Sequence, residues 1–265
     1  MEKYHRSRIN TPDQSKPKAD SEINLSEPIN LTISEQLVDF FLTYARLQKD
    51  PIKFGTDIET WAKEKANSAL EEQKNQEMEN KKNNQPKKYF FGVYDGQKMI
   101  ATGEIHIFEE SKQAKKHAHL CHLTVDPAYR NKQIGRKLVE VRTDLARREG
   151  CEFLTTRVNT RNLPGMQNKF NEGFYINGVK IYRKKEPVWS EFEFRKEIGG
   201  KPKQTDTQDE NATIPLYDPE IIKQKIADGQ VGVGLIPTEP YDINIKKSVY
   251  EDGDVRKFAL KMQKG

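Results

Sequence analysis

The sequence predicts an α+β fold in which two helices precede a sheet that occupies the centre of the chain. Apolar residues recur at helical spacing from Leu37 to Leu47, which indicates an amphipathic helix. Farther along, YFFGVYDGQKMIATGEIHIFE reads as two strands joined by Asp95-Gly96, a dipeptide typical of hairpin turns. A strand, a basic loop and a helix then follow within residues 120–148. Helical and strand periodicities therefore occupy separate parts of the chain.

Sequence signals mark where the first strand and the two N-terminal helices begin and end. Apolar and polar residues alternate in INLTI (29–33), as expected for a strand, and Thr32 or Ser34 can cap the helix that follows. Asp50-Pro51 ends that helix. A second helix begins near Asp57, and its polar tail predicts a segment that projects from the core or frays.

The elements after the hairpin follow from similar signals. The helix predicted at 133–148 carries its apolar residues on one face and stops at Gly150. Further elements are a strand in CEFLTTRV, a short helix in NLPGMQNKFNEGF, and two closing strands in GVKIYRKK and VWSEFEFR.

Composition predicts one core with polar appendages. Among the 265 residues 34% are hydrophobic and 32% charged, which is lean for a globule of this length. We expect a polar disordered arm at residues 1–27, a folded domain at 28–198, and a linker with a C-terminal extension at 199–265. In that extension Asp218-Pro219 can start a helix, and a weaker helix is predicted at about 254–263.

Charge and cysteine content narrow the class of protein. The net charge is +5, but acidic and basic residues are interspersed without a basic stripe carrying aromatics, which disfavours nucleic-acid binding. Two cysteines cannot build a disulfide framework, and no apolar run is long enough for a membrane-spanning helix. We expect a cytoplasmic protein, although delivery to another cell without a classical signal is equally compatible with this pattern.

The stretch KKHAHLCHLTV (115–125) concentrates residues that bind metals and move protons. It holds three of the five histidines and one of the two cysteines. Strand alternation places His117, His119 and Cys121 on one face with Leu123 and Val125, and His122 on the other. Four interpretations are open: a zinc site completed by His106, a covalent acyl carrier at Cys121, half-buried strand residues without function, and a catalytic base.

The loop after this strand is suited to bind a polyanion. It leads into a helix N-terminus, where unpaired backbone N–H groups and the helix dipole favour negative charge. Arg130, Lys132 and Arg136 add positive side chains. Together these features are suited to a pyrophosphate.

The segment LTVDPAYRNKQIGRKLVE resembles the signature of the GNAT superfamily of acetyl-CoA-dependent N-acyltransferases. The signature, Arg/Gln-x-x-Gly-x-Gly/Ala at the start of a long helix, falls on Arg130, Gln133 and Gly135. The succession of elements from 28 to 198 also matches, and Asn162 with Gly173-Phe174 resembles a later family segment. The resemblance implies a mixed, mostly antiparallel twisted sheet, splayed at the cofactor site and flanked by helices.

The resemblance further implies how acetyl-CoA, the cosubstrate, would be bound. Backbone groups of Leu123 and Val125 would pair with the pantetheine arm, and Asn162 would contact the cofactor. The pyrophosphate would be held by amides of the loop and the first helical turn, namely Arg130, Lys132, Gln133, Ile134, Gly135 and Arg136.

Two positions depart from the family pattern. Gln133 stands where the first glycine is usual, so the backbone there approaches the pyrophosphate less freely. Lys169 stands where a tyrosine often serves as general acid, and Tyr175 or Tyr129 would have to substitute. Some family members carry a catalytic glutamate six residues before the end of the signature strand, a position that His119 occupies here.

These observations predict an N-acetyltransferase that moves an acetyl group from acetyl-CoA directly to a primary amine. His119 would be the base or would orient a water, and Tyr175 is the candidate acid. The acceptor is a small molecule or a protein, and the length outside the core with the polar second helix favours a macromolecule or partner protein. The alternative is a non-catalytic acyl-CoA-binding or interaction module on the same fold.

Overall fold

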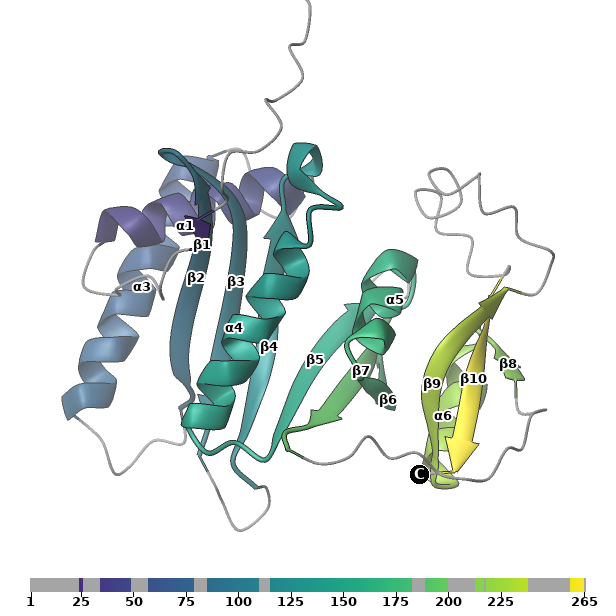
Figure 1. Ribbon diagram of the computed structural model, residues 1–265. Helices are drawn as coiled ribbons and strands as arrows, with labels where there is room; N and C mark the ends of the chain where they lie inside the picture. The colour runs from purple at the N-terminus through teal and green to yellow at the C-terminus, as the bar shows by residue number, and fades with distance from the viewer. Residues whose placement is uncertain are drawn as a thin grey trace, which may run out of the picture.

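A computed structural model (Figure 1) confirms the predicted α+β class. It describes residues 24–25, 34–48, 57–78, 85–109, 115–182, 189–199, 213–216, 218–237 and 258–264. The strand predicted at 29–33 and most of the predicted N-terminal arm and linker lie outside these ranges. Within the described residues no helix is both long enough and apolar enough to span a membrane.

The elements follow the order expected from the sequence, from the two N-terminal helices to the closing strands. The helices are α1 (Ser34–Gln48), α3 (Ile58–Met78), the 3-10 turn η1 (Pro127–Tyr129), α4 (Ile134–Arg148), α5 (Leu163–Asn171) and α6 (Pro219–Ala227). The strands are β1 (Asn24–Leu25), β2 (Lys87–Asp95), β3 (Lys98–Phe108), β4 (His117–Val125), β5 (Phe153–Asn159), β6 (Tyr175–Tyr182), β7 (Trp189–Glu197), β8 (Thr213–Pro215), β9 (Gln230–Pro237) and β10 (Phe258–Lys264).

The strands form one mixed sheet in the order β1-β2-β3-β4-β5-β7-β6-β9-β10-β8. Neighbouring strands are antiparallel except for β4 and β5, which are parallel. The parallel ladder runs only from His117–Phe153 to Leu120–Thr156, although both strands continue. Figure 1 shows β5 turning away from β4 beyond this point. The splay expected in the sheet is therefore present.

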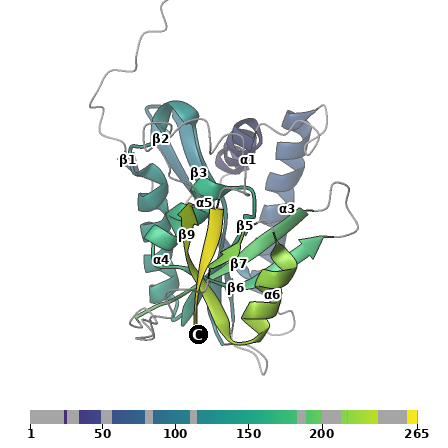
Figure 2. The ribbon, with the colours of Figure 1, turned by 90° about the vertical axis from the view of Figure 1, so that its right-hand side faces the viewer.

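Helices cover both faces of β2 and β3, with α4 on one side and α1 and α3 on the other (Figure 2). On one face, α1 and α3 pack Leu37, Phe40 and Ala62 against Phe90 of β2. On the other face, α4 packs Ile134 and Leu138 into the main core. The α4 segment thus buries the apolar face that its periodicity predicts.

A β-bulge in β4 interrupts the alternation expected for this strand. The pairing with β3 shifts between Thr102–Thr124 and Glu104–Cys121, so β4 contains one extra residue. His122 has φ of 51°, in the left-handed region that non-glycine residues rarely adopt. Its side chain hydrogen-bonds Glu104, the cross-strand partner of Cys121. The prediction that His122 lies on the opposite face from Cys121 is wrong, because it assumed unbroken alternation.

The buried guanidinium of Arg142 holds this bulge together. Arg142 is only 1% exposed, and its Nη1 donates to the backbone oxygens of Glu104 at 3.0 Å and Cys121 at 3.2 Å. Its Nε donates to the Leu138 oxygen one helical turn back. A Cβ at Gly103 would lie 3.1 Å from the Arg142 Cζ, so the glycine makes room for the guanidinium. Arg142 therefore ties α4 to both strands at the bulge.

The C-terminal segment extends the sheet. Ile176 of β6 pairs with Gly232 of β9, and Ile222 of α6 is buried in the same core. Asp218 caps α6 and Pro219 opens it, as predicted. The second helix predicted at about 254–263 is wrong where the structure describes it, because residues 258–264 form a strand. Leu260 and Met262 are buried at a period of two against β9, and this pairing outweighs a weak helical preference.

The sequence does not predict the short strand β1. Asn24 and Leu25 lie inside the predicted arm and pair with Tyr94 and Val93 of β2. A dipeptide of this length has little strand signal of its own, and the edge of β2 supplies its hydrogen-bonding partners.

We expect Arg142→Leu to lower the free energy of unfolding by roughly 3 kcal/mol, because it leaves buried carbonyl oxygens at the bulge without donors. Urea denaturation measures the loss. Arg148→Leu is the matched control, because Arg148 is an exposed arginine on the same helix; it should change stability by less than about 1 kcal/mol. Equal losses in both variants would contradict the role given to Arg142.

Candidate active site

The site is centred where β4 and β5 separate. Beyond the Leu120–Thr156 pair, β4 continues to Val125 and β5 to Asn159 without pairing to each other. The Thr156 hydroxyl donates to the Leu120 oxygen at 2.8 Å, which closes the ladder at the branch point. The edge of β4 after Leu120 thus faces β5 without a ladder partner there, and its backbone groups are suited to bind an extended chain.

The loop before α4 is shaped to receive an anion. Asn131 and Gln133 have φ of 64° and 60°, and Gln133 is the N-cap of α4 without a capping side-chain hydrogen bond. Left-handed residues alternating with others turn successive N–H groups toward one concavity. The first N–H groups of α4, from Ile134 onward, have no acceptor within the helix. Arg130 is exposed beside them.

The left-handed backbone at Gln133 explains the departure noted from the sequence. A glycine at this position adopts such a φ without steric cost, whereas glutamine adopts it at roughly 1 kcal/mol. The loop therefore keeps a glycine-like conformation although the glycine is absent. Lys132 and Arg136 are also exposed. Their side chains contact the Tyr129 ring and Glu140 respectively.

The other residues expected to bind a cofactor lie near the ends of the parted strands. Leu123 and Val125 pack against the main core on the α4 side of β4. Gly135, in the first turn of α4, lies next to Val125, and a Cβ there would be in ordinary van der Waals contact with it at 3.8 Å. Asn162 follows β5 and caps α5 by accepting a hydrogen bond from the Gly165 N–H at 3.0 Å.

A cavity of about 310 Å³ opens beside the parallel ladder, on the face of the sheet that carries His117 and His119. Its walls come from strands β3 to β7. The lining residues are Phe108, His117, His119, Thr155, Thr156, Arg157, Asn177 and Glu193. Arg157 and Glu193 form an ion pair across the wall at 3.0 Å. The cavity therefore combines an aromatic end with a charged one.

His119 is a neutral, oriented imidazole in this wall. The Thr155 hydroxyl donates to the Ala118 oxygen, so it accepts from Nδ1 of His119 at 2.9 Å and leaves Nε2 as an acceptor. Burial lowers the pKa of His119 from 6.5 to about 4, and the nearby positive charge of His106 and Arg157 adds to this. His119 is therefore uncharged at neutral pH.

The neighbouring histidines have different surroundings. His117 is stacked between Phe108 and Phe153, with ring centroids 4.9 Å apart on each side. His122 and His106 both contact the buried carboxylate of Glu104, one through each carboxylate oxygen. Burial raises the pKa of Glu104, but the hydrogen bonds to the two histidines outweigh burial and hold the pKa at about 2. The carboxylate is thus ionised.

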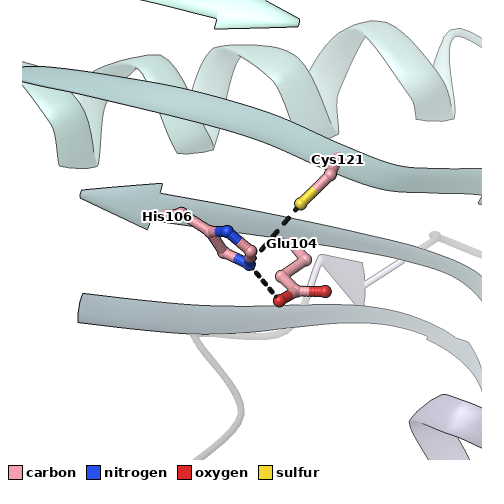
Figure 3. A group of neighbouring side chains, drawn as sticks. All are labelled: Glu104, His106 and Cys121. Carbon is pink, nitrogen blue, oxygen red and sulfur yellow. Dashed lines mark hydrogen bonds and ion pairs between the residues drawn. The ribbon is translucent and has the colours of Figure 1, made fainter. Parts of the chain in front are cut away.

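Glu104, His106 and Cys121 lie together as Figure 3 shows, with donor atoms within 4.8 Å of one another. This spacing would suit a metal ion. Among the described residues, no other group of three or more possible metal ligands lies this close together. The same atoms are already engaged, because His106 Nε2 bonds Glu104 and lies 3.7 Å from the Cys121 sulfur. Burial and the Glu104 charge raise the pKa of the Cys121 thiol, which disfavours both thiolate ligation and nucleophilic attack.

The structure does not bring the tyrosines expected as acids to His119. The Tyr175 hydroxyl donates to Glu197 at 3.0 Å, and burial raises the pKa of Tyr175 to about 12. Tyr175 lies on β6, with β7 and β5 between it and β4. Tyr129 donates to Asp95 at 2.6 Å. Lys169, at the position of the family's usual tyrosine, is buried and paired with Glu172 at 2.6 Å.

Glu104 was missed by sequence reasoning. The signal available was a carboxylate within the apolar run MIATGEIHIF, where an unpaired charge would be costly and a partner is therefore expected. The sequence suggests for His106, two residues along the same strand, only the completion of a zinc site. The bulged strand β4 has no glycine or proline to mark the bulge that brings His122 to Glu104, although Gly103 lies opposite it on β3.

A comparison with protein-family models finds a match. Residues 56–167, less than half of the chain, match the model of the Acetyltransferase (GNAT) family. The match includes the signature loop and confirms the resemblance found in the sequence. No curated protein matches the chain by sequence.

Several solved structures to which this chain is similar are described as acetyltransferases. A GNAT-family acetyltransferase from Streptococcus pneumoniae has 18% identity and a TM-score of 0.47 over 67% of this chain and 100% of its own. The PaiA N-acetyltransferase from Thermoplasma acidophilum, in complex with coenzyme A, has 19% identity and a TM-score of 0.41 over 67% and 99%. The ribosomal-protein-S18-alanine N-acetyltransferase from Escherichia coli has 16% identity and a TM-score of 0.36 over 50% and 81%. Likeness at this level says nothing about the substrate of this chain.

Gln133→Gly should keep or raise stability, whereas Gln133→Val should lower it by about 1 kcal/mol or more relative to the glycine variant. The reason is the left-handed φ at this position. Urea denaturation compares the two. The control pair is Lys137→Gly and Lys137→Val, one turn into α4, where helical φ makes valine the better residue. If the same residue, glycine or valine, gave the more stable protein at both positions, the strain assigned to Gln133 would be contradicted.

The low pKa of His119 predicts a pH dependence of stability. Between pH 6.5 and about 4 the unfolded chain binds a proton that folded His119 does not, so stability falls as the pH falls. His119→Gln removes this contribution and should lose less stability than the wild type between about pH 7 and pH 5. Urea denaturation at both values measures it. Between about pH 7.5 and 9 the free energies of unfolding of the two proteins should change equally with pH, since His119 is neutral in both the folded and the unfolded chain. Equal losses at acid pH would contradict a buried neutral imidazole.

Proposed function

We propose that the chain transfers an acetyl group from acetyl-CoA to a primary amine. One observation carries the proposal, namely that the parting of β4 and β5 lies beside the uncapped, basic N-terminus of α4. This places a free strand edge next to an anion site, as a thioester on a long diphosphate-bearing arm requires. The GNAT family match supports acyl transfer as the class of chemistry.

The proposed cosubstrate fits the site at both of its ends. The pyrophosphate would accept hydrogen bonds from the backbone around Gln133 to Arg136, where the helix dipole favours negative charge. The pantetheine arm would pair with β4 near Leu123 and Val125, whose edge toward β5 lacks a ladder. Asn162, with its carboxamide oxygen engaged in the α5 cap, has its amide nitrogen to offer.

The acceptor amine would occupy the cavity beside the branch point. Its entry from the α1 side would bring it to His119, whose Nε2 is oriented to accept a hydrogen bond. A neutral acceptor there can position the amine, or a water, without competing for its proton. His119 thus has the orienting role that the sequence suggested, with low basicity.

A non-catalytic acyl-CoA-binding module remains the alternative function. The observation that favours it is Lys169, a buried, paired lysine where a phenol is usual. The deciding experiment mixes purified protein with acetyl-CoA and a panel of polyamines, aminoglycosides and peptides with free α-amines, and follows the release of free thiol. Release with at least one amine supports transfer. Tight CoA binding without release for any amine supports the module.

Reversing the charge of the loop should weaken CoA binding. We expect Arg130→Glu with Arg136→Glu to raise the dissociation constant of CoA at least roughly tenfold, about 1.4 kcal/mol, because both side chains flank the anion site. Titration calorimetry measures it. The control, Arg147→Glu with Arg148→Glu, makes the same charge change at the other end of α4. If both pairs weaken binding equally, the loop is not the anion site.

A further inference from the structure

Glu104 and His122 form a buried carboxylate–imidazole pair that the proposed function has not used. The Glu104 side chain is 5% exposed, and the His122 side chain 39% exposed. Nδ1 of His122 donates to Oε2 of Glu104. With its Nδ1 hydrogen directed at Glu104, the neutral form of His122 presents its lone pair at Nε2, and within the described part of the chain no hydrogen bond occupies Nε2.

His122 lies beside α1 and near the branch point of the sheet, outside the set of residues that line the cavity. Its ring meets Tyr44 of α1 edge-on, with centroids 4.6 Å apart. His122 also lies just beyond Leu120, where the parallel ladder ends and β4 parts from β5. The free Nε2 therefore belongs to an exposed side chain at the branch point of the sheet, between α1 and the strand edge assigned to the pantetheine.

The backbone of His122 is held in a strained conformation by hydrogen bonds at the bulge. Its φ of 51° costs of the order of 1 kcal/mol for a non-glycine residue. The Thr102 hydroxyl donates to the His122 oxygen at 3.1 Å, and Arg142 donates to the oxygen of the preceding residue, Cys121. Strain that is fixed from both sides of the sheet is typical of a side chain aimed at a substrate.

We propose that His122, oriented by Glu104, is the general base that removes the proton from the acceptor amine. This assignment rests on the proposed acetyl transfer. The amine nitrogen attacks the thioester carbonyl carbon, forming the C–N bond, while its proton passes to Nε2 of His122. The C–S bond then breaks, and the sulfur leaves with the electron pair. The imidazolium, stabilised meanwhile by Glu104, returns the proton to the thiolate or to water.

Comparison of the two histidines supports this division of roles. His119 donates to an uncharged hydroxyl, and its pKa of about 4 makes it a weak proton acceptor. His122 donates to an ionised carboxylate, which stabilises the charged imidazole after proton transfer. The second histidine on Glu104, His106, occupies the other carboxylate oxygen and fixes its orientation. His119 therefore positions the amine and His122 removes its proton.

The first test is kinetic, with the most active amine of the panel and the full-length protein. His122→Gln should lower kcat roughly 100-fold or more and leave the dissociation constant of CoA within about twofold. Glu104→Gln should lower kcat in the same direction, whereas the matched control Glu152→Gln, on an exposed glutamate, should not. A His122→Gln enzyme with kcat within about threefold of the wild type would overturn the assignment.

Chemical rescue separates a catalytic from a structural role. Free imidazole should restore at least part of the kcat lost in His122→Ala, because the truncated side chain leaves space for it. The same addition to His117→Ala, which removes an imidazole stacked between two rings, should give no rescue. Failure of rescue in His122→Ala, in a protein that still binds CoA normally, counts against a base at this position.

A second measurement does not depend on the acceptor. Diethyl pyrocarbonate acylates neutral imidazole nitrogens, and mass spectrometry locates the product. We expect His122 to be acylated in the wild type, and the rate of its acylation to change several-fold in Glu104→Gln while the rate for His117 stays the same. If the wild type binds CoA but acetylates no amine, the proposed transfer fails, and this reactivity alone decides whether His122 is an activated base. An unreactive His122 would reject it.

Discussion

Arg142 is the constraint on which the geometry of the site depends. A guanidinium buried to 1% exposure gives up hydration and is stable only if its N–H groups find acceptors, and here the acceptors are carbonyls of two strands and its own helix. Burial lowers its pKa to about 10, which leaves it charged at neutral pH. The guanidinium is charged and rigid. If the two strands shifted into regular pairing, it would lose its carbonyl acceptors. The absent side chain at Gly103 is part of the same arrangement.

The chemistry of the face follows from that constraint. The bulge turns His122 toward Glu104. Three histidines on β4 therefore have different neighbours. His117 is sandwiched by rings, His119 is bound to a hydroxyl, and His122 is bound to an ionised carboxylate. Identical side chains thus acquire different partners and orientations from their neighbours. The loop before α4 adds a second strained element, the left-handed Gln133, at the end assigned to the diphosphate.

Local signals in the sequence predicted most of the fold. Periodicity, caps and the Asp95-Gly96 turn located the two N-terminal helices, the hairpin, α4 and the closing strands, and the signature loop located the anion site. The bulge was not predictable, because the residues of HAHLCHLTV alternate as in a regular strand. The residue that holds the bulge, Arg142, lies about twenty residues away in the sequence. The partnership of Glu104 with His122 was hidden for the same reason. Residues 258–264 were misassigned because their short apolar pattern fits two periods, and only the edge of β9 selects one.

The attachment of the C-terminal segment has a consequence for solubility. In the described structure β6 is flanked by β7 on one side and meets β9 on the other, through Ile176 and Gly232. A Cβ at Gly232 would lie 2.8 Å from the Leu260 side chain, so the glycine makes room for β10 beside β9. The open edge of a strand presents N–H and C=O groups through which sheets of separate molecules can join. At Ile176 the C-terminal strands occupy this edge of β6 and so oppose self-association there.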